Sequence, residues 1–282
     1  MMLKKKFKLL RYYLLRHLFN THRETPIYIF GYHKSGTTLL GKIFKEICLK
    51  YGWQYKSVAG SFNQLPSADV VFFLHSQVDF SKLPQKYIGI HMVRDPRDII
   101  ISGYLYHKRT TEAWCTQKNF QTEKPIQYPQ VPNSQMHRSE AWKKNYLKRL
   151  KPHSYQEKIN SLNEEEGILF EMDHYGKWTL EDMLKWDFET ANCLELKFED
   201  IMADFNNEVM KIFWHCQLSD AQIKFAKRCS DKEDMNKMSS KAISKNSHIS
   251  SANTSRWKKY FTKEIQTAFD ANFKDVLKKY NY

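Results

Sequence analysis

Residues 27–40 constrain the fold more than any other part of this chain. They read Ile-Tyr-Ile-Phe-Gly-Tyr-His-Lys-Ser-Gly-Thr-Thr-Leu-Leu. The sequence predicts an apolar strand over residues 27–31, a short loop rich in Gly, Lys, Ser and Thr, and then an apolar-periodic helix over residues 37–51. Such a turn directs backbone N–H groups, a helix N-terminus and a lysine toward one small volume, which predicts an anion site.

The loop departs from the Walker pattern of nucleotide kinases. Gly31 and Gly36 fit the first half of G-x-x-x-x-G-K-[ST], but Thr37 stands where the Walker lysine belongs, and the lysine lies inside the loop at Lys34. A kinase also needs an acidic residue near a strand end to hold Mg²⁺, whereas the predicted strand 70–74 leads into His75. A P-loop-like nucleotide kinase is therefore an alternative, but the chain lacks both the Walker lysine and the acidic residue that a kinase needs. A ligand-free strand-to-helix turn is the other alternative.

A second motif follows a predicted buried strand over residues 87–92. It reads Arg-Asp-Pro-Arg-Asp from Arg94 onward, and Pro96 suits the first turn of a helix over residues 96–108. Arg94 would then stand at the carboxyl end of the strand, and Ser102, two helical turns later, would face the same edge. An arginine fork and a hydroxyl can bind a second phosphate. Alone, the segment fits a capped helix start with local ion pairs equally well.

Together the two motifs resemble the sulfotransferase family that uses 3′-phosphoadenosine 5′-phosphosulfate (PAPS). In that family a Lys-Ser-Gly-Thr-Thr loop binds the 5′-phosphosulfate. An Arg-x-Pro-[KR]-Asp segment, with Ser eight residues after the Arg, binds the 3′-phosphate. Both patterns are present here with the family's spacing. The resemblance covers about the first 110 residues well and the region from Leu194 onward loosely. It implies PAPS as co-substrate without a metal, bound by Lys34, Ser35, Gly36, Thr37, Thr38, Arg94 and Ser102.

The resemblance also suggests which residues carry the chemistry. Sulfuryl transfer needs a positive group beside the leaving phosphate and a proton acceptor. We expect Lys34 to neutralise charge on the bridging oxygen and His75 to act as the general base, as a histidine at this place does in the family. The match is partial, because relatives often read Lys-Thr-His where this chain reads Phe-Leu-His. A structural strand-end histidine is the alternative, and His107 and Glu46 are reserve candidates for the base.

The resemblance is looser toward the C-terminus. Phe198 lies in a segment similar to the family's Tyr-Glu-Asp, so it is expected either to stack on the adenine or to be plain core. The family's Arg-Lys-Gly loop, which adds contacts to the 3′-phosphate ahead of a Trp, is degraded here. Before Trp257 the chain contains Ser250, Ser251 and Arg256. Either these residues substitute for that loop, or the 3′-phosphate is bound more weakly.

Strands alternating with helices predict an α/β fold: a single three-layer domain with a central parallel sheet flanked by helices, similar to P-loop NTPases. We expect this domain over residues 26–282, with an acceptor-side insertion at about residues 110–186. The acceptor would be a hydroxyl or amine of a small molecule or carbohydrate. Its pocket is expected to include Tyr104, Tyr106 and His107. The oligomeric state is left open.

The N-terminal residues 1–25 predict a basic amphipathic helix. Leu3, Phe7, Leu10, Leu14 and Leu18 recur at helical spacing among lysines and arginines, in a stretch too short and too charged to span a bilayer. Either this apolar stripe packs on the domain, which we favour, or the helix makes a peripheral contact with an anionic membrane.

The whole chain is basic, with 45 lysines and arginines against 31 acidic residues. This balance favours anionic partners. A non-enzyme alternative is therefore a basic protein that binds nucleic acid or a membrane surface, with nucleic acid the less favoured partner. The five cysteines form no C-x-x-C pair, which is typical of reduced thiols in a cytoplasmic protein.

Overall fold

The computed structural model describes residues 2–18, 21–58, 64–118, 140–239 and 253–282. Its contacts divide the chain into two compact units. The first contains residues 1–93 and 187–238, and the second contains residues 94–186 and 239–282. Within the described residues, no helix is both long enough and apolar enough to cross a membrane.

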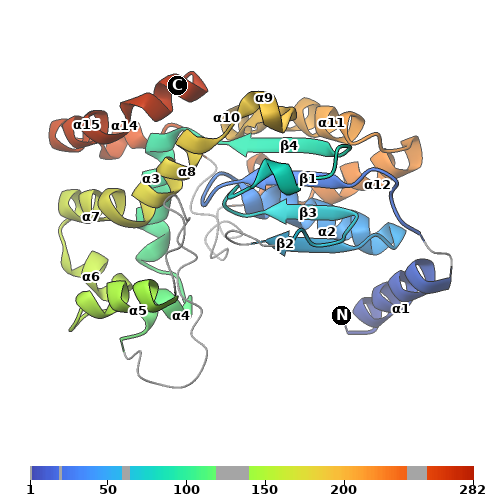
Figure 1. Ribbon diagram of the computed structural model, residues 1–282, viewed down its shortest axis with the longest axis horizontal. Helices are drawn as coiled ribbons and strands as arrows, with labels where there is room; N and C mark the ends of the chain where they lie inside the picture. Colours follow the sequence, from blue (N-terminus) through green and yellow to red (C-terminus); the bar gives the residue numbers. More distant parts are fainter. Residues whose placement is uncertain (1, 19–20, 59–63, 119–139, 240–252) are drawn as a thin grey trace. The chain divides into compact units, whose positions relative to one another are not determined.

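The first unit is built on a five-stranded parallel sheet (Figure 1). Its strands are β1 (Ile27–Gly31), β2 (Tyr55–Val58), β3 (Val70–Phe73), β4 (Ile88–Val93) and β5 (Cys193–Lys197), in the order β2-β3-β1-β4-β5. The central strands β1, β3 and β4 are buried along their whole length, as their apolar runs predict. All carboxyl ends meet at one edge of the sheet. The predicted α/β class with a central parallel sheet is confirmed.

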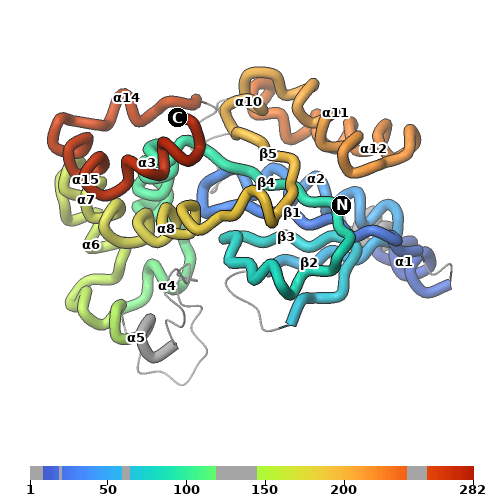
Figure 2. Tube along the Cα trace, turned by 45° about the horizontal axis from the view of Figure 1, so that its top comes forward, coloured from blue at the N-terminus to red at the C-terminus, as the bar shows by residue number. Residues whose placement is uncertain are grey.

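Helices flank this sheet. The helix α2 (Thr37–Tyr51) packs against β2 and β3, while α1 (Met2–Leu18) and α12 (Asp220–Ser230) pack against α2. After α9 (Phe188–Ala191) and β5 the chain forms α10 (Phe198–Ala203) and α11 (Phe205–His215), which Figure 2 shows beside α12. Two short 3-10 helices, η1 (Phe80–Lys82) and η3 (Met235–Lys237), complete the unit. Asp204 ends α10 and caps α11 by accepting the N–H of Asn207, so residues 198–215 form two helices.

The described part of the second unit is helical. It contains α3 (Pro96–His107), α4 (Ala113–Thr116), α5 (Glu140–Arg149), α6 (Tyr155–Ser161), α7 (Glu164–Glu171), a π-helical turn η2 (Met172–Gly176), α8 (Lys177–Lys185), α14 (Trp257–Tyr260) and α15 (Lys263–Tyr280). The helices α8 and α15 lie side by side (Figure 2), and the Tyr280 hydroxyl donates to the Met183 carbonyl at 2.9 Å. Ser250 and Ser251 fall outside the described residues, as do residues 119–139 of the expected insertion.

The packing of α1 differs from the favoured expectation. The helix packs on α2, but the described part of the apolar stripe is not its contact face, because Leu10, Leu14 and Leu18 are exposed. The side chains of Leu3 and Phe7 lie outside the described part. The side that holds α1 in place carries Arg16, whose guanidinium pairs with Asp69 at 2.6 Å. The prediction that the stripe packs on the domain is therefore wrong for these three leucines. An ion pair and the neighbouring side chains on the other side of the helix secure it instead.

Candidate functional site

The loop between β1 and α2 is closed by its own polar groups. The hydroxyl of Ser35 accepts the N–H of Tyr32 at 2.9 Å and donates to the Tyr32 carbonyl at 3.0 Å. The Ser35 N–H also donates to that carbonyl, at 3.1 Å. Ser35 is fully buried, so the structure gives it a part in shaping the loop. At the preceding position, Lys34 has a left-handed backbone with a φ of 65°, a conformation that non-glycine residues adopt mainly at turns and functional sites.

Gly36 is the N-cap of α2 and also has a left-handed backbone, with a φ of 98°. A Cβ at this position would lie 2.8 Å from the Phe198 ring and closer still to the Met92 methyl group. Thr37 and Thr38 then open the helix, where the first N–H groups have no intrahelical acceptor and the helix dipole is positive. The structure thus forms the predicted strand-to-helix turn, and the buried Phe198 ring packs against Gly36 in it.

A buried polar network supports the start of this loop. His91 on β4 is fully buried, with Nδ1 2.5 Å from the Glu195 carboxylate and Nε2 3.1 Å from the Tyr32 hydroxyl. Because a carboxylate only accepts, Nδ1 donates to Glu195, and Nε2 lies within hydrogen-bond distance of the Tyr32 hydroxyl. The chain thereby ties the loop to β4 and β5. No local sequence pattern indicated this network, since its members lie on β4, on β5 and in the loop after β1.

His75 lies at the predicted edge of the sheet. It follows β3, it is buried, and its ring stacks on that of His33, with centroids 6.4 Å apart and planes inclined by 22°. The next residue, Ser76, donates from its hydroxyl to the Gly31 carbonyl at 2.8 Å, which fixes this segment against the end of β1. The structure therefore places His75 beside the loop that carries Lys34. Sequence reasoning missed His33, whose one signal was its position next to Lys34.

The second motif builds the start of α3 in the second unit. Asp95 caps the helix by accepting the Arg97 N–H at 2.9 Å, and Pro96 is the first helical residue, as predicted. The Arg94 guanidinium donates to the buried Asp98 carboxylate at 3.2 Å. Ser102 is also buried and lies four residues after Asp98, so both face the same side of α3. Arg94 and Ser102 thus lie on or beside one face of this helix start.

The C-terminal segment brings a further arginine to this helix start. The Trp257 N–H donates to Asp98 at 2.9 Å, and the Arg97 guanidinium lies 3.8 Å from the centre of the Trp257 ring. The pKa of Arg256, the residue before Trp257, is lowered by burial and by the like charge of Arg94. A second guanidinium group therefore lies within electrostatic range of Arg94, and the Asp98 carboxylate acts on both.

His107, a reserve candidate for the base, lies in a buried network of polar and aromatic side chains. His107 is fully buried, with Nδ1 2.8 Å from Glu171, which also accepts the Tyr155 hydroxyl at 2.9 Å. Its ring is surrounded by aromatic rings at centroid distances between 4.9 and 5.4 Å. Tyr104 and Tyr106 are buried as well. The structure therefore places these three residues in the core of the second unit. Glu46 lies half-buried on α2.

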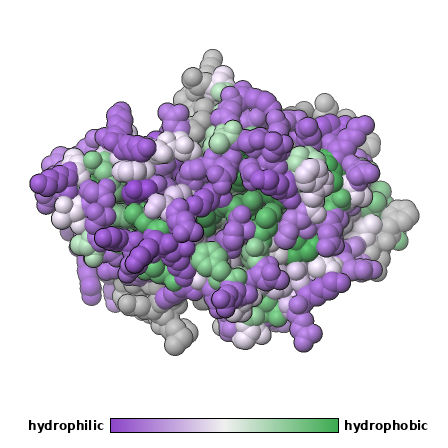
Figure 3. Space-filling view, turned by 90° about the horizontal axis from the view of Figure 1, so that it is seen from above, coloured by the Kyte–Doolittle hydropathy of each residue, from purple (hydrophilic) through white to green (hydrophobic). Residues whose placement is uncertain are grey.

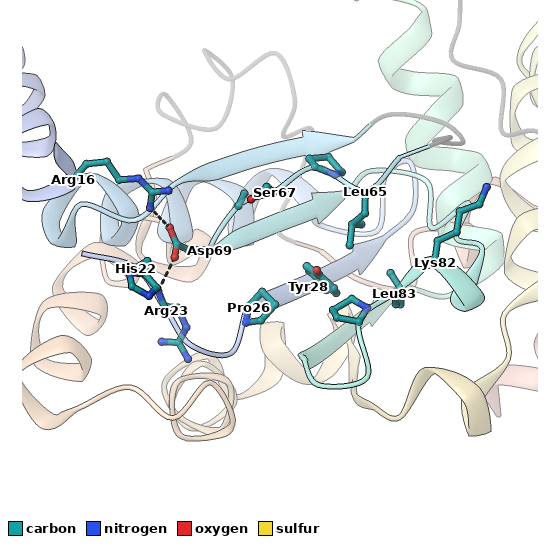
Figure 4. A pocket seen from close by; sticks show the side chains of 13 residues that line it. Arg16, His22, Arg23, Pro26, Tyr28, Leu65, Ser67, Asp69, Lys82 and Leu83 are labelled. Carbon is teal, nitrogen blue, oxygen red and sulfur yellow. Dashed lines mark hydrogen bonds and ion pairs between the residues drawn. The ribbon is translucent and has the colours of Figure 1, made fainter. Parts of the chain in front are cut away.

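A cavity of about 660 Å³ lies at the other end of the sheet, at the amino ends of β1 and β3 (Figure 4). Arg16, His22 and Lys82 contribute to its lining, and Asp69 accepts both the Arg16 guanidinium and the Arg23 N–H at 2.6 Å. None of the residues predicted for the site lines it. Asp69 thus serves to anchor α1.

Two further findings concern metals and thiols. Among the described residues, no group of three or more His, Cys, Asp or Glu side chains could hold a metal ion. All five cysteines lie in the described part of the chain, and all are free thiols. Burial raises the pKa of the Cys216 thiol to about 12, which keeps it protonated and unreactive at neutral pH.

Comparison with known proteins places the chain in a family. A search of curated proteins gives no match. Among solved structures, a crystal structure of mouse sulfotransferase SULT7A1 complexed with PAP is similar, with 18% sequence identity and a TM-score of 0.47, over 94% of this chain and 89% of that chain. The family model of the sulfotransferase domain matches residues 53–281, a span that begins after the Lys34 loop and includes Arg94, Ser102 and Arg256. This match covers most of the chain, which therefore belongs to the sulfotransferase domain family, as the two motifs predicted, and is a sulfotransferase enzyme.

Proposed function

We propose that the protein transfers the sulfuryl group of PAPS to a hydroxyl or amine of a small-molecule or carbohydrate acceptor. The observation that supports the proposal is a pair of segments, in a sulfotransferase, whose backbone and charge suit an anion. One is the turn at Lys34–Gly36 with the N-terminus of α2, and the other is the arginine cluster at the start of α3. PAPS carries a phosphosulfate at one end and a 3′-phosphate at the other, so each segment has a matching group.

The residues of the first unit suit an in-line displacement. The acceptor oxygen or nitrogen bonds to sulfur while the bond from sulfur to the bridging oxygen breaks, and 3′-phosphoadenosine 5′-phosphate (PAP) leaves. The Lys34 ammonium and the first N–H groups of α2 stabilise the negative charge that grows on the leaving group. His75, beside the same loop, takes the proton of the acceptor. Binding and positioning by these groups require no covalent enzyme intermediate.

Turnover of PAPS with a panel of acceptors tests the proposal. The panel should rank polar sugars against phenols, steroids and small amines, with release of PAP as the readout. We expect PAP release with the wild-type protein and its loss in Lys34→Ala. Lys42→Ala is the matched control, because Lys42 lies on α2 and its ammonium pairs with Glu233 at 2.9 Å. Failure of the wild-type protein to bind PAP in calorimetry would refute the proposal.

Two variants separate binding from chemistry. His75→Ala should lower turnover by about 10²–10⁴ and leave PAP affinity unchanged, because a general base acts on the acceptor. Arg94→Ala should weaken PAP binding by roughly 1.5–3 kcal/mol, since it removes a charge-assisted contact. A wild-type rate in the His75 variant would mean that another group is the base. Unchanged PAP binding in the Arg94 variant would overturn the assignment of the 3′-phosphate.

A further inference from the structure

The helix α1 presents a broad apolar surface to solvent. Five large apolar side chains on this one helix are exposed: Leu9 by 41%, Leu10 by 57%, Tyr13 by 55%, Leu14 by 42% and Leu18 by 71%. Elsewhere in the described residues, the exposed large apolar side chains are Leu184, Phe188 and Trp214. Most of the molecular face in Figure 3 is hydrophilic. A concentration of apolar side chains on one exposed helix marks an interaction surface.

The opposite side of α1 already has a partner. Arg16 pairs with Asp69 at 2.6 Å, and the Leu15 carbonyl accepts both the N–H and the hydroxyl of Thr21, at 3.3 and 3.1 Å. Leu15 also packs so closely on Gly52 that a Cβ there would come within 2.7 Å of it. With about 100° between successive residues, the five exposed side chains occupy the other half of the helix surface. Contact with the first unit therefore leaves them uncovered.

The charge of α1 identifies the partner. The helix sequence contains Lys4, Lys5, Lys6, Lys8, Arg11 and Arg16 and no Asp or Glu. A basic helix with an exposed apolar face of leucines and a tyrosine fits the boundary between the headgroups and acyl chains of an anionic bilayer. We propose that α1 docks the protein on an anionic membrane surface, with the face formed by Leu9, Leu10, Tyr13, Leu14 and Leu18 buried among the lipids.

Other partners fit this surface less well. Two copies of α1 facing each other would bring together two strongly basic helices, neither of which contains an Asp or Glu. A nucleic acid would be bound by the basic side chains but would gain nothing from the leucines. The helix has 17 residues, six of them lysine or arginine, so it lies on a bilayer rather than across it. The inference does not depend on the proposed function, because α1 carries none of the residues assigned to catalysis.

Co-sedimentation of the full chain with lipid vesicles tests the proposal. The vesicles should be phosphatidylcholine alone and phosphatidylcholine mixed with phosphatidylserine. We expect binding only to the anionic vesicles. Leu10→Asp should weaken this binding about tenfold or more, because it removes an inserted leucine and adds a negative charge. Arg11→Gln should weaken it about fivefold, the effect of one basic residue near an anionic surface. Leu184→Asp, the matched exposed leucine on α8, should bind like the wild type.

The controls separate docking from misfolding and from self-association. All variants should keep wild-type PAP affinity and circular dichroism. Sedimentation velocity without lipid should give the same species for the wild type and Leu10→Asp. Equal vesicle binding by Leu10→Asp and the wild type would overturn the proposal, as would no preference for anionic vesicles. A wild-type oligomer that dissociates in Leu10→Asp would assign the surface to a second copy of the chain instead.

Discussion

Replacement of Gly36 by alanine tests whether the backbone of the loop, and not only its residue types, makes the phosphate site. The φ of 98° at this position costs an L-residue roughly 1–2 kcal/mol. The new Cβ would also lie 2.8 Å from the Phe198 ring, and crowding of this kind in a packed core costs about 1–3 kcal/mol. We expect the free energy of unfolding to fall by about 2–5 kcal/mol.

Chemical denaturation and PAP calorimetry measure the two consequences. The midpoint of unfolding should shift downward, because the strain is present only in the folded state. PAP binding should weaken as well, since relief of the contact with Phe198 moves the backbone that presents the first N–H groups of α2. The two effects share one cause, so a second-site change of Phe198 to leucine, which makes room for the new methyl group, should recover part of both.

Gly41→Ala is the matched control on the same helix. A Cβ there would lie 3.5 Å from the Tyr55 hydroxyl, an ordinary contact, and Gly41 is inside α2. Alanine at this position should stabilise the protein by roughly 0.5–1 kcal/mol. If Gly36→Ala unfolds and binds PAP like the wild type, the reasoning about the loop is refuted. If both glycine variants destabilise equally, a general sensitivity of α2 is the cause.

Three further predictions follow from the second unit. Arg256→Ala should weaken PAP binding in calorimetry by roughly 1.5–3 kcal/mol, and Arg256→Lys should retain part of this binding free energy. Wild-type PAP affinity in both variants would show that Arg256 does not contact the phosphate. Glu171→Ala should lower the free energy of unfolding in denaturant by about 3–5 kcal/mol, because His107 and Tyr155 lose their buried partner; a change below about 1 kcal/mol would contradict this. Burial lowers the pKa of His174 in the folded protein below its ordinary 6.5, so protonation favours the unfolded state. The free energy of unfolding should therefore fall as the pH drops below about 6.5. His174→Gln should flatten this dependence of the free energy of unfolding on pH.

The parts of the site that depend on local sequence were predictable. The apolar strand, the glycine with a left-handed backbone and the following helix are all specified within residues 27–51, and the structure places β1 and α2 at the predicted bounds. Pro96 likewise specifies the start of α3. In these segments backbone propensity, burial and capping agree, so that no distant contact is needed to decide the structure.

Features that depend on distant contacts were not predictable. The edge strand β2 has half-buried ends and an exposed middle, so its sequence Tyr-Lys-Ser-Val carries little apolar signal. The approach of Arg256 to Arg94 joins segments more than 150 residues apart, and no local pattern encodes it. The stripe of α1 misled because helical spacing identifies an apolar face but not which side of the helix the domain covers.

Because the two compact units alternate along the chain, some contacts of the first unit can form only after most of the second unit has been synthesised. β4 ends at Val93, but its neighbour β5 begins at Cys193, after the whole intervening segment of the other unit. At a translation rate of about 5–20 residues per second, one edge of β4 stays unpaired for about 5–20 s until β5 has been synthesised. The hydrogen bond from the Trp257 N–H to Asp98 can form only after a still longer interval. The nascent chain must therefore keep an apolar strand edge from aggregating during that interval, and neither unit can be expressed alone as one contiguous fragment.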